Sequence, residues 1–286
     1  MDWELLIVDD ASTDKAAEIV QRFQEADSRI HFAAIMETTP LISVIMPCYN
    51  MEKFIASSIQ SVCNQTFSHW ELLIVDDAST DKTAKIVQRF QETDSRIHFA
   101  AKSMHTGIAA TRNQAIGMAK GQYLAFLDAD DVWHPDKLKK QFDFMKTKNI
   151  GFSYSAYNWI DEAGNELGKT IPTAGDLNYN DYLHNTIIGC STVMVNTNIT
   201  GLISVPKFRT SEDTATWLNI LKKGFLAYAL SEILVSYRIR EKSASSNKIK
   251  AAQDLWRVYR QQENLSLFDA LACFFSYAYH AIKKRL

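Results

Sequence analysis

Three polar clusters stand directly after short apolar runs, where their side chains could bind a ligand together. They are Pro47-Cys-Tyr-Asn50, Asp76-Asp77 and Asp128-Ala-Asp-Asp131. The three carboxylates of the last cluster repel one another unless a cation or solvent separates them. Hard divalent ions such as Mn²⁺ or Mg²⁺ suit oxygen ligands and usually also bind substrate phosphates. The alternative is an acidic turn with Asp131 as a helix cap, but the two neighbouring clusters favour a metal and diphosphate site.

Two residues of the other clusters have side chains that can bind a nucleobase. Tyr49 can stack on a base, and Asp77 can accept a hydrogen bond from a ring N–H, which uracil offers and cytosine does not. Taken alone, Tyr49 could equally be a packing residue at a rim, and Asp77 could cap a helix.

A further acidic pair, Glu212-Asp213, precedes a helical run that contains Trp217, Leu218 and Leu221. The helix dipole favours carboxylates in a first turn, so the pair could be structural. It could also supply a general base.

The elements that would position these residues alternate from residue 41 onward. Strands are expected at 41–46, 71–75, 96–101 and 123–127, and helices at 51–66, around residues 86–90, at 107–119 and from Pro135. Such alternation predicts an α/β fold whose mostly parallel sheet has helices on both faces. Ligands bind at the carboxyl ends of the strands in that architecture, where all three clusters would meet.

The chain contains an internal copy, because residues 3–34 match residues 70–101 at 29 of 32 positions. We interpret residues 1–35 as a duplicated remnant of residues 68–102, and residues 36–247 as the main domain. The rival interpretation is that the copy adds a strand and a helix to a sheet edge. Deleting residues 1–35 tests this, since loss of stability or activity would contradict the remnant.

Composition excludes several classes of protein. The net charge of −2 provides no basic field for nucleic acid. The four cysteines form no CxxC pair, which fits a reducing compartment and argues against a zinc site. No signal peptide or membrane-spanning run is expected, so we expect a cytoplasmic protein.

Residues 248–286 form a segment of a different kind. They hold seven Lys or Arg against three Asp or Glu, together with many aromatic residues. A basic, aromatic helix can lie on the anionic inner leaflet of a membrane. The alternative, a terminal helix packed on the domain, stays open.

The motif series resembles that of family 2 glycosyltransferases with the GT-A fold. The motifs are Ser-Val-Ile-Met-Pro-Cys-Tyr-Asn50, Ile-Val-Asp-Asp-Ala-Ser-Thr-Asp81, Gly107-x4-Arg112-Asn113, Phe-Leu-Asp-Ala-Asp-Asp131 and Glu212-Asp213-x3-Trp217. They span residues 40–240, and the chain looks most similar to the teichuronic acid biosynthesis glycosyltransferases. The resemblance implies a Rossmann-like nucleotide-binding half, an acceptor half and C-terminal helices. It also implies an inverting enzyme that transfers a hexose from a UDP-sugar to a lipid-linked or growing surface polysaccharide.

The resemblance also implies roles for single residues. On the donor side, Asp77 would contact uracil, Tyr49 and Pro47 would line its site, and Arg112 would lie near the phosphates or brace the loop. Asp128 would lie near the ribose and the metal, and Asp130 would bind the Mn²⁺ or Mg²⁺. Asp213 would be the general base, with Glu212 and Trp217 on the acceptor side.

The sequence departs from the family pattern at two positions. Ala115 stands where the family often has glycine, and Arg240 follows Tyr237-Arg238-Ile239 where many members have a histidine. The resemblance therefore supplies no third protein ligand to the metal.

Two other functions were weighed. A non-catalytic subunit that binds sugar nucleotide or scaffolds an assembly complex would not need Asp77, Asp128, Asp130 and Asp213 together. A dinucleotide oxidoreductase would need Gly-x-Gly-x-x-Gly after the first strand, where Pro47-Cys-Tyr-Asn50 stands instead.

Overall fold

The computed structural model describes residues 5–9, 22–23, 26–27, 30–34, 40–241 and 248–283 of the 286-residue chain. It divides into two units, residues 1–40 and residues 41–286. In the first unit, β1 (Leu5–Asp9) and β2 (Ile30–Ala34) form a parallel two-stranded sheet in which Leu5 pairs with Ile30. The second unit repeats this register in its own copy, where Leu72 pairs with Ile97. The remnant interpretation of residues 1–35 stays a prediction.

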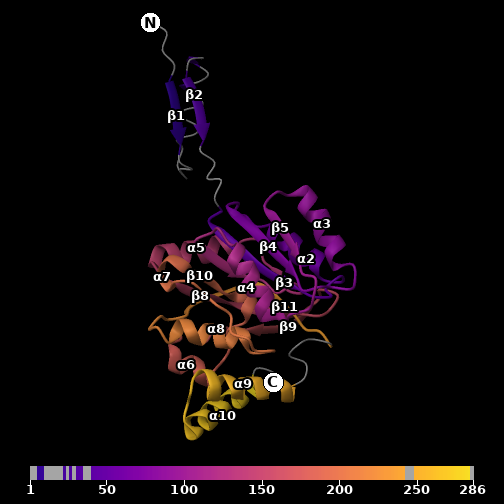
Figure 1. Cartoon of the computed structure of the whole chain (residues 1–286). Helices are drawn as coiled ribbons and strands as arrows, with labels where there is room; N and C mark the ends of the chain where they lie inside the picture. The colour runs from indigo at the N-terminus through magenta and orange to yellow at the C-terminus, as the bar shows by residue number, and fades with distance from the viewer. Residues whose placement is uncertain are drawn as a thin grey trace. The chain divides into compact units, whose positions relative to one another are not determined.

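The second unit contains a sheet of nine strands within its described part, in the order β5-β4-β3-β6-β10-β8-β11-β7, with β9 paired to β8. Its first half is parallel and consists of β3 (Ile42–Cys48), β4 (Trp70–Asp76), β5 (Ile97–Ala101) and β6 (Tyr123–Phe126) (Figure 1). These strands lie within one or two residues of the predicted ones. Strand β3 runs past Pro47, which tolerates its missing N–H because β6 has already ended on that side.

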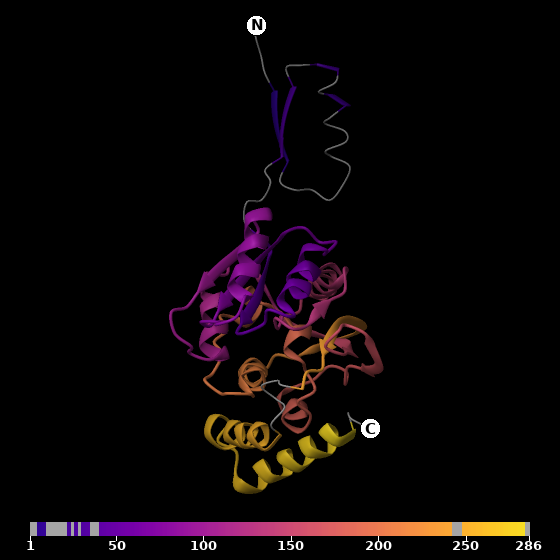
Figure 2. The same cartoon turned by 90° about the vertical axis from the view of Figure 1, so that its right-hand side faces the viewer.

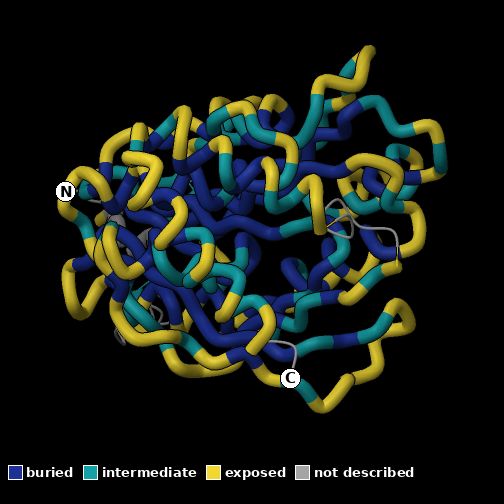
Figure 3. Tube along the Cα trace, turned by 90° about the horizontal axis from the view of Figure 1, so that it is seen from below, coloured by how far each residue is buried: buried dark blue, intermediate teal, exposed yellow. Residues whose placement is uncertain are grey.

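Helices cover both faces of this parallel half. Side chains alternate along each strand, so Ile45 and Leu73 face Ala115 of α4 (Ile108–Met118), whereas Val44 and Leu72 share the opposite core with Ile59. That opposite core is covered by α2 (Ile55–Cys63), α3 (Thr83–Thr93) and α5 (Lys137–Lys148). Figure 3 shows the buried residues running through the interior beneath exposed loops. The predicted fold with helices on both faces is confirmed here.

The second half of the sheet is mixed. Strand β10 (Met194–Asn196) runs antiparallel between β6 and β8 (Phe152–Ile160), and β11 (Tyr228–Arg238) runs parallel to β8. Two further strands, β7 (Val132–Trp133) and β9 (Glu166–Ile171), pair antiparallel with β11 and β8. The sheet is thus less parallel than the alternation predicted, since β7, β9 and β10 all run antiparallel to their neighbours; of these, β9 follows β8 directly through a hairpin that contains Gly164.

Short helices α6 (Tyr179–His184) and α7 (Thr197–Thr200) and the longer α8 (Glu212–Leu221) belong to this second half. The chain continues through α9 (Lys248–Arg257), a π-helical turn at Val258–Gln262 and α10 (Leu267–Lys283). Figures 1 and 2 show α9 and α10 together at one end of this unit, beyond α6 and α8. Among the helices that the structure describes, none combines the length and apolar character needed to cross a bilayer.

Candidate active site

A cavity of about 1070 Å³ opens where β3, β4 and β6 end and α8 begins. It brings together residues from all three polar clusters and the acidic pair, which are far apart in the sequence. Eight of the nine predicted site residues line it: Pro47, Tyr49, Asp77, Arg112, Asp128, Asp130, Glu212 and Asp213. The ninth, Trp217, lies 1% exposed in the core against Phe126 and Phe152, so the structure does not bring it to the cavity.

Asp77 is held at one end of the cavity by the loop that leads into α4. Its carboxylate accepts hydrogen bonds from the Thr106 N–H at 2.9 Å, the Thr106 hydroxyl at 3.0 Å and the Gly107 N–H at 2.7 Å. Burial alone would raise the pKa of Asp77, but these donors outweigh it and lower that pKa. Gly107 adopts φ of +93°, which glycine tolerates and other residues rarely adopt. Asp77 is therefore a fixed anion at the end of β4.

His105 and Tyr49 lie at the same end of the cavity. The Nδ1 atom of His105 is 2.9 Å from Oδ2 of Asp77, and its ring lies 4.3 Å from that of Tyr49. Both rings are exposed enough to meet a ligand, since Tyr49 is 39% exposed and the His105 side chain 56%. His105 thus contacts the carboxylate that we predicted from the sequence to accept a hydrogen bond from a base.

The carboxylates of the third cluster have different surroundings. Asp128 and Asp130 line the cavity, whereas Asp131 is buried behind it. Asp131 accepts hydrogen bonds from the Ser191 hydroxyl at 2.6 Å and the Arg238 N–H at 2.9 Å. Asp131 thus ties the cluster to β11 and is not the helix cap that the alternative interpretation required.

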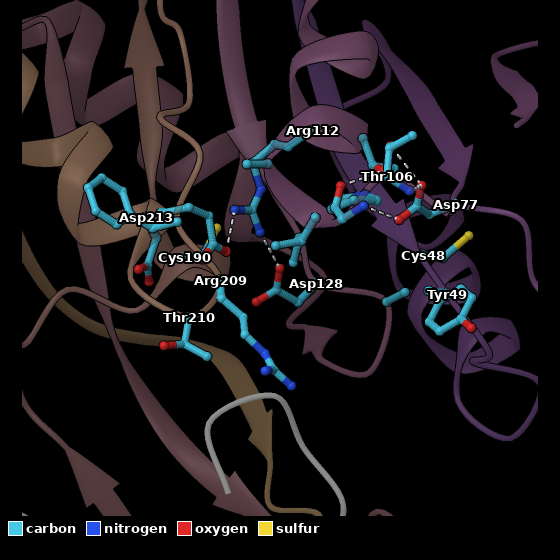
Figure 4. Close-up of a pocket in the computed structure, with 18 of the residues that line it drawn as sticks. Cys48, Tyr49, Asp77, Thr106, Arg112, Asp128, Cys190, Arg209, Thr210 and Asp213 are labelled. Carbon is cyan, nitrogen blue, oxygen red and sulfur yellow. Dashed lines mark hydrogen bonds and ion pairs between the residues drawn. The ribbon is translucent and has the colours of Figure 1, made fainter. Parts of the chain in front are cut away.

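Arg112 connects the two sides of the cavity (Figure 4). Its Nη2 lies 2.9 Å from Oδ1 of Asp128, and its Nη1 lies 3.0 Å from Oε1 of Glu212. Arg112 is 2% exposed, and although burial disfavours its charge, the surrounding carboxylates raise its pKa. It therefore braces the end of β6 against the start of α8.

Glu212 and Asp213 open α8 as predicted, but they differ in their contacts. Glu212 is buried and paired with Arg112; burial and the nearby Asp213 raise its pKa to about 7. Asp213 is half-buried on the cavity wall and accepts a hydrogen bond from the Thr214 N–H at 2.6 Å. Burial also raises the pKa of Asp213. Asp213 is the carboxylate of the pair that is free to take a proton from a ligand, because no described Lys or Arg forms an ion pair with it.

Asp128 and Asp130 are the two carboxylates that a divalent ion could share. Asp130 is paired with Arg240, whose Nε lies 2.6 Å from its Oδ2. Within residues 40–241 and 248–283, no three His, Cys, Asp or Glu side chains are arranged to hold a metal. Two oxygen ligands fit Mg²⁺ or Mn²⁺, which usually complete their coordination with water and substrate phosphates.

Several cavity residues were not predicted from the sequence. His105, Lys207, Arg209 and Arg240 line the cavity, as do Asp254 and Arg257 of α9. Gly107 before a helix was a usable signal for the loop with His105, since such loops approach ligands closely. Arg240 stands where the resemblance places a histidine in many family members, which was a second signal. The others reach the cavity through the tertiary fold, and nothing in their local sequence indicates it.

Solved structures share this fold. The Staphylococcus aureus protein TarS, solved with UDP-GlcNAc, superimposes with a TM-score of 0.64 at 22% identity, covering 77% of this chain and 64% of that one. The mannosyltransferase PcManGT of Pyrobaculum calidifontis, solved with GDP-Man and Mn²⁺, gives a TM-score of 0.63 at 18% identity, covering 85% of this chain and 74% of that one. The fold is therefore that of the GT-A glycosyltransferases.

Curated relatives are more similar in sequence. The teichuronic acid biosynthesis glycosyltransferase TuaG of Bacillus subtilis is 47% identical over 247 residues, 86% of this chain and 98% of its own length. The Escherichia coli UDP-Glc:α-D-GlcNAc-diphosphoundecaprenol β-1,3-glucosyltransferase WfgD is 40% identical over 219 residues, 76% of this chain and 85% of its own. The model of glycosyl transferase family 2 matches residues 43–204. The chain, with its motifs gathered around one cavity, belongs to glycosyl transferase family 2.

Proposed function

We propose that this glycosyltransferase moves a hexose from a UDP-sugar to a lipid-linked or growing surface polysaccharide, with inversion and with Mn²⁺ or Mg²⁺. The observation that carries the proposal is that Asp77, the pair Asp128 and Asp130, and Asp213 all line one cavity. The reaction needs these three functions: recognition of the nucleobase, a site for the diphosphate, and a general base that accepts the proton of the acceptor hydroxyl.

In the proposed reaction the donor spans the cavity from Tyr49 and Asp77 to Asp128. Uracil replaces His105 on the carboxylate of Asp77 and lies against Tyr49, near Pro47. Asp128 and Asp130 would hold the divalent ion, which neutralises the charge that builds on the departing diphosphate. Arg112 keeps Asp128 in place from the protein side.

Asp213 completes the reaction from the opposite side. It accepts the proton of the acceptor hydroxyl, whose oxygen forms a bond to the anomeric carbon on the face opposite the diphosphate. The bond from that carbon to the β-phosphate oxygen breaks, and UDP leaves with the electron pair, so the configuration inverts. A positioned base of this kind accelerates a reaction by about 10²–10⁴-fold.

The substitution Asp213→Asn tests the assignment. We expect kcat to fall by about 10²–10⁴-fold, while calorimetry shows near-normal binding of UDP and Mn²⁺. Asp143→Asn, on the exposed face of α5, is the matched control. Wild-type turnover in Asp213→Asn would reject the base, and absence of turnover in the wild type would leave the non-catalytic subunit as the better account.

The donor and acceptor are proposed from the relatives. WfgD is named for transfer from UDP-Glc to a diphosphoundecaprenol-linked GlcNAc, and TuaG for teichuronic acid biosynthesis. A panel of UDP-sugars, assayed for UDP release with Mn²⁺ and then with chelator, tests the donor and the ion together. Undiminished activity in chelator would refute the metal dependence.

A lipid-linked acceptor implies work at the inner face of the membrane, and α10 offers a surface for peripheral contact. Phe268, Phe275 and Tyr279 are 84%, 68% and 63% exposed on one stripe, while Ala270 and Cys273 face the core. Residues 248–286 hold seven of the 31 basic residues and three of the 33 acidic ones, so this end attracts anionic lipid.

Vesicle flotation tests the membrane contact. Changing Phe268, Phe275 and Tyr279 to Ser should abolish binding to anionic vesicles. The control is Leu202→Ser, which should not: Leu202 is 91% exposed but lies outside α10. Equal flotation of the triple variant and the wild type would end the proposal.

We also propose that residues 36–247 are the catalytic domain and that residues 1–35 are dispensable. The support is that the family model matches residues 43–204, and that TuaG over 98% of its own length matches 247 of the 286 residues, so this relative lacks a counterpart to about forty of them. Deletion of residues 1–35 should leave UDP release unchanged, and a loss of activity would favour the rival interpretation.

A further inference from the structure

The charged residues that line the cavity fall into two groups. Most carboxylates there lie in an ion pair with a basic side chain: Asp128 and Glu212 share Arg112, Asp130 pairs with Arg240, Asp77 with Lys102, and Asp254 with Arg257. Lys207 and Arg209 differ, because neither forms an ion pair with any residue in the described part of the chain. Both are exposed, so the segment that leads into α8 brings two cations to the cavity that have no ion-pair partner among the described residues.

The segment that carries these cations is fixed at both ends. The side-chain amide of Asn113 donates to the Val205 carbonyl at 2.8 Å and accepts from the Val205 N–H at 2.8 Å. At the other end, the Thr210 hydroxyl donates to Asp254 of α9 at 3.1 Å. Between them Phe208 packs on the core. Lys207 and Arg209 are therefore long cations on an anchored loop, which lowers the entropy lost when they bind an anion.

The position of this loop indicates which anion it would meet. Arg209 stands four residues before Asp213, and Figure 4 shows its side chain starting between Asp213 and Asp128, with the guanidinium directed away from Arg112. The donor diphosphate is assigned to Asp128 and Asp130, so a second anion bound at this loop, which leads to Asp213, belongs to the acceptor. In an acceptor whose sugar is linked to lipid through a diphosphate, one hexose ring separates the attacking hydroxyl from that diphosphate.

We infer that Lys207 and Arg209 bind the diphosphate of a lipid-linked acceptor, with Arg257 as a third contact. This inference rests on the proposed function and names the residues by which that site recognises its acceptor. Arg257 lines the same cavity, and its side chain is 59% exposed although it is paired with Asp254. A diphosphate diester carries two negative charges, which two to three cations neutralise through charge-assisted hydrogen bonds.

The experiment compares two acceptors that differ only in the diphosphate. One is N-acetylglucosamine α-linked through a diphosphate to a short alkyl chain, and the other is the simple alkyl glycoside of the same sugar. The variants are Lys207→Gln and Arg209→Gln, each with its matched control on the exposed face of α3, Lys85→Gln and Arg89→Gln. Acceptor KM, kcat and the Kd of UDP are measured for each.

We expect each cavity variant to raise KM for the diphosphate acceptor about 10-fold or more. KM for the glycoside and the Kd of UDP should stay as in the wild type, and Arg209→Lys should recover part of the loss. Equal changes of KM for both acceptors would overturn the inference. So would a weaker Kd of UDP, which would assign the cations to the donor, or a loss of vesicle flotation without a change in KM, which would assign them to lipid headgroups. If the wild type transfers to neither acceptor, the proposed function itself fails.

Discussion

The buried cation Arg112 offers a sharp test of how the two sides of the cavity are joined. Its two terminal nitrogens reach separate carboxylates, Asp128 at 2.9 Å and Glu212 at 3.0 Å. Lysine keeps the charge but has a single side-chain nitrogen. Arg112→Lys can therefore pair with one of the two carboxylates and leaves the other without an ion-pair partner. Arg112→Met removes both contacts and the charge.

The expected magnitudes follow from burial. A hydrogen bond to a buried charged group contributes about 1.5–3 kcal/mol, so Arg112→Lys should lose roughly that much stability. Breaking a buried pair costs about 3–5 kcal/mol, which is the expectation for Arg112→Met at high pH. At lower pH the loss should shrink, because Glu212 can then take a proton.

The sign of this pH dependence follows from the pKa of Glu212, which is about 7 even with Arg112 present. Without the arginine this pKa rises further in the folded state, whereas the unfolded value stays ordinary. Between the ordinary pKa of 4.5 and the raised pKa of the folded variant, the folded chain holds a proton that the unfolded chain has released. The stability of the variant therefore falls as the pH rises through this range. The slope is at most about 1.4 kcal/mol per pH unit.

Urea unfolding at pH 6 and pH 8 measures these effects. Arg89→Lys and Arg89→Met, on the exposed face of α3, are the controls and should stay within about 0.5 kcal/mol of the wild type. The reasoning would be refuted if Arg112→Lys also stayed within that margin, or if Arg112→Met lost more stability at pH 6 than at pH 8.

Three further predictions concern residues around the cavity. Glu212→Gln removes a negative charge next to Asp213, so the acidic limb of the kcat/KM profile should move to lower pH; an unchanged or higher midpoint would contradict this. Asn113→Ala removes both hydrogen bonds to Val205, so acceptor KM should rise several-fold while calorimetry shows unchanged binding of UDP; weaker UDP binding would place its effect on the donor side. Gly121→Ala would place a Cβ 2.7 Å from the Ser43 N atom and should destabilise the protein by about 1–3 kcal/mol in urea, whereas Gly117→Ala, with open space around it in α4, should not; equal stabilities would show that β3 shifts freely.

The sequence predicted the first half of the fold well because local signals agree there. Buried strands such as 71–75 end in polar residues, and amphipathic helices follow them, which leaves little choice but a parallel sheet. The second half was harder. Strands β8 and β11 pair in parallel although the paired residues, from Tyr228 with Ser153 to Arg238 with Ile160, are 75 to 78 positions apart, and no local pattern indicates such a pairing.

The candidate site divides in the same way. Residues at strand ends, such as Asp77 and Asp128, could be predicted from the architecture, since the carboxyl ends of neighbouring parallel strands share an edge. Arg257 could not, because it reaches the cavity from α9 through tertiary packing; the family resemblance marked the position of Arg240, two residues after β11, but not its ion pair with Asp130. Trp217 was predicted to lie on the acceptor side but does not line the cavity. It lies one helical turn after Asp213, yet its side chain packs in the core.

The two copies of the repeat share the residues that form the paired strands but differ in the residues that follow them. Both copies pair their strands in the same register, Leu5 with Ile30 and Leu72 with Ile97, so the pairing needs no context beyond the repeated residues. The sequences diverge directly afterwards. Ala101 leads to Lys102 and on to Thr106-Gly107, whose N–H groups fix Asp77, whereas Ala34 leads to Ile35-Met36. The first copy thus repeats the sequence of the strand and its two aspartates but is not followed by the residues that hold the second aspartate, Asp77, as an anion. The loop that fixes this aspartate therefore follows one of the two copies in the sequence and not the other.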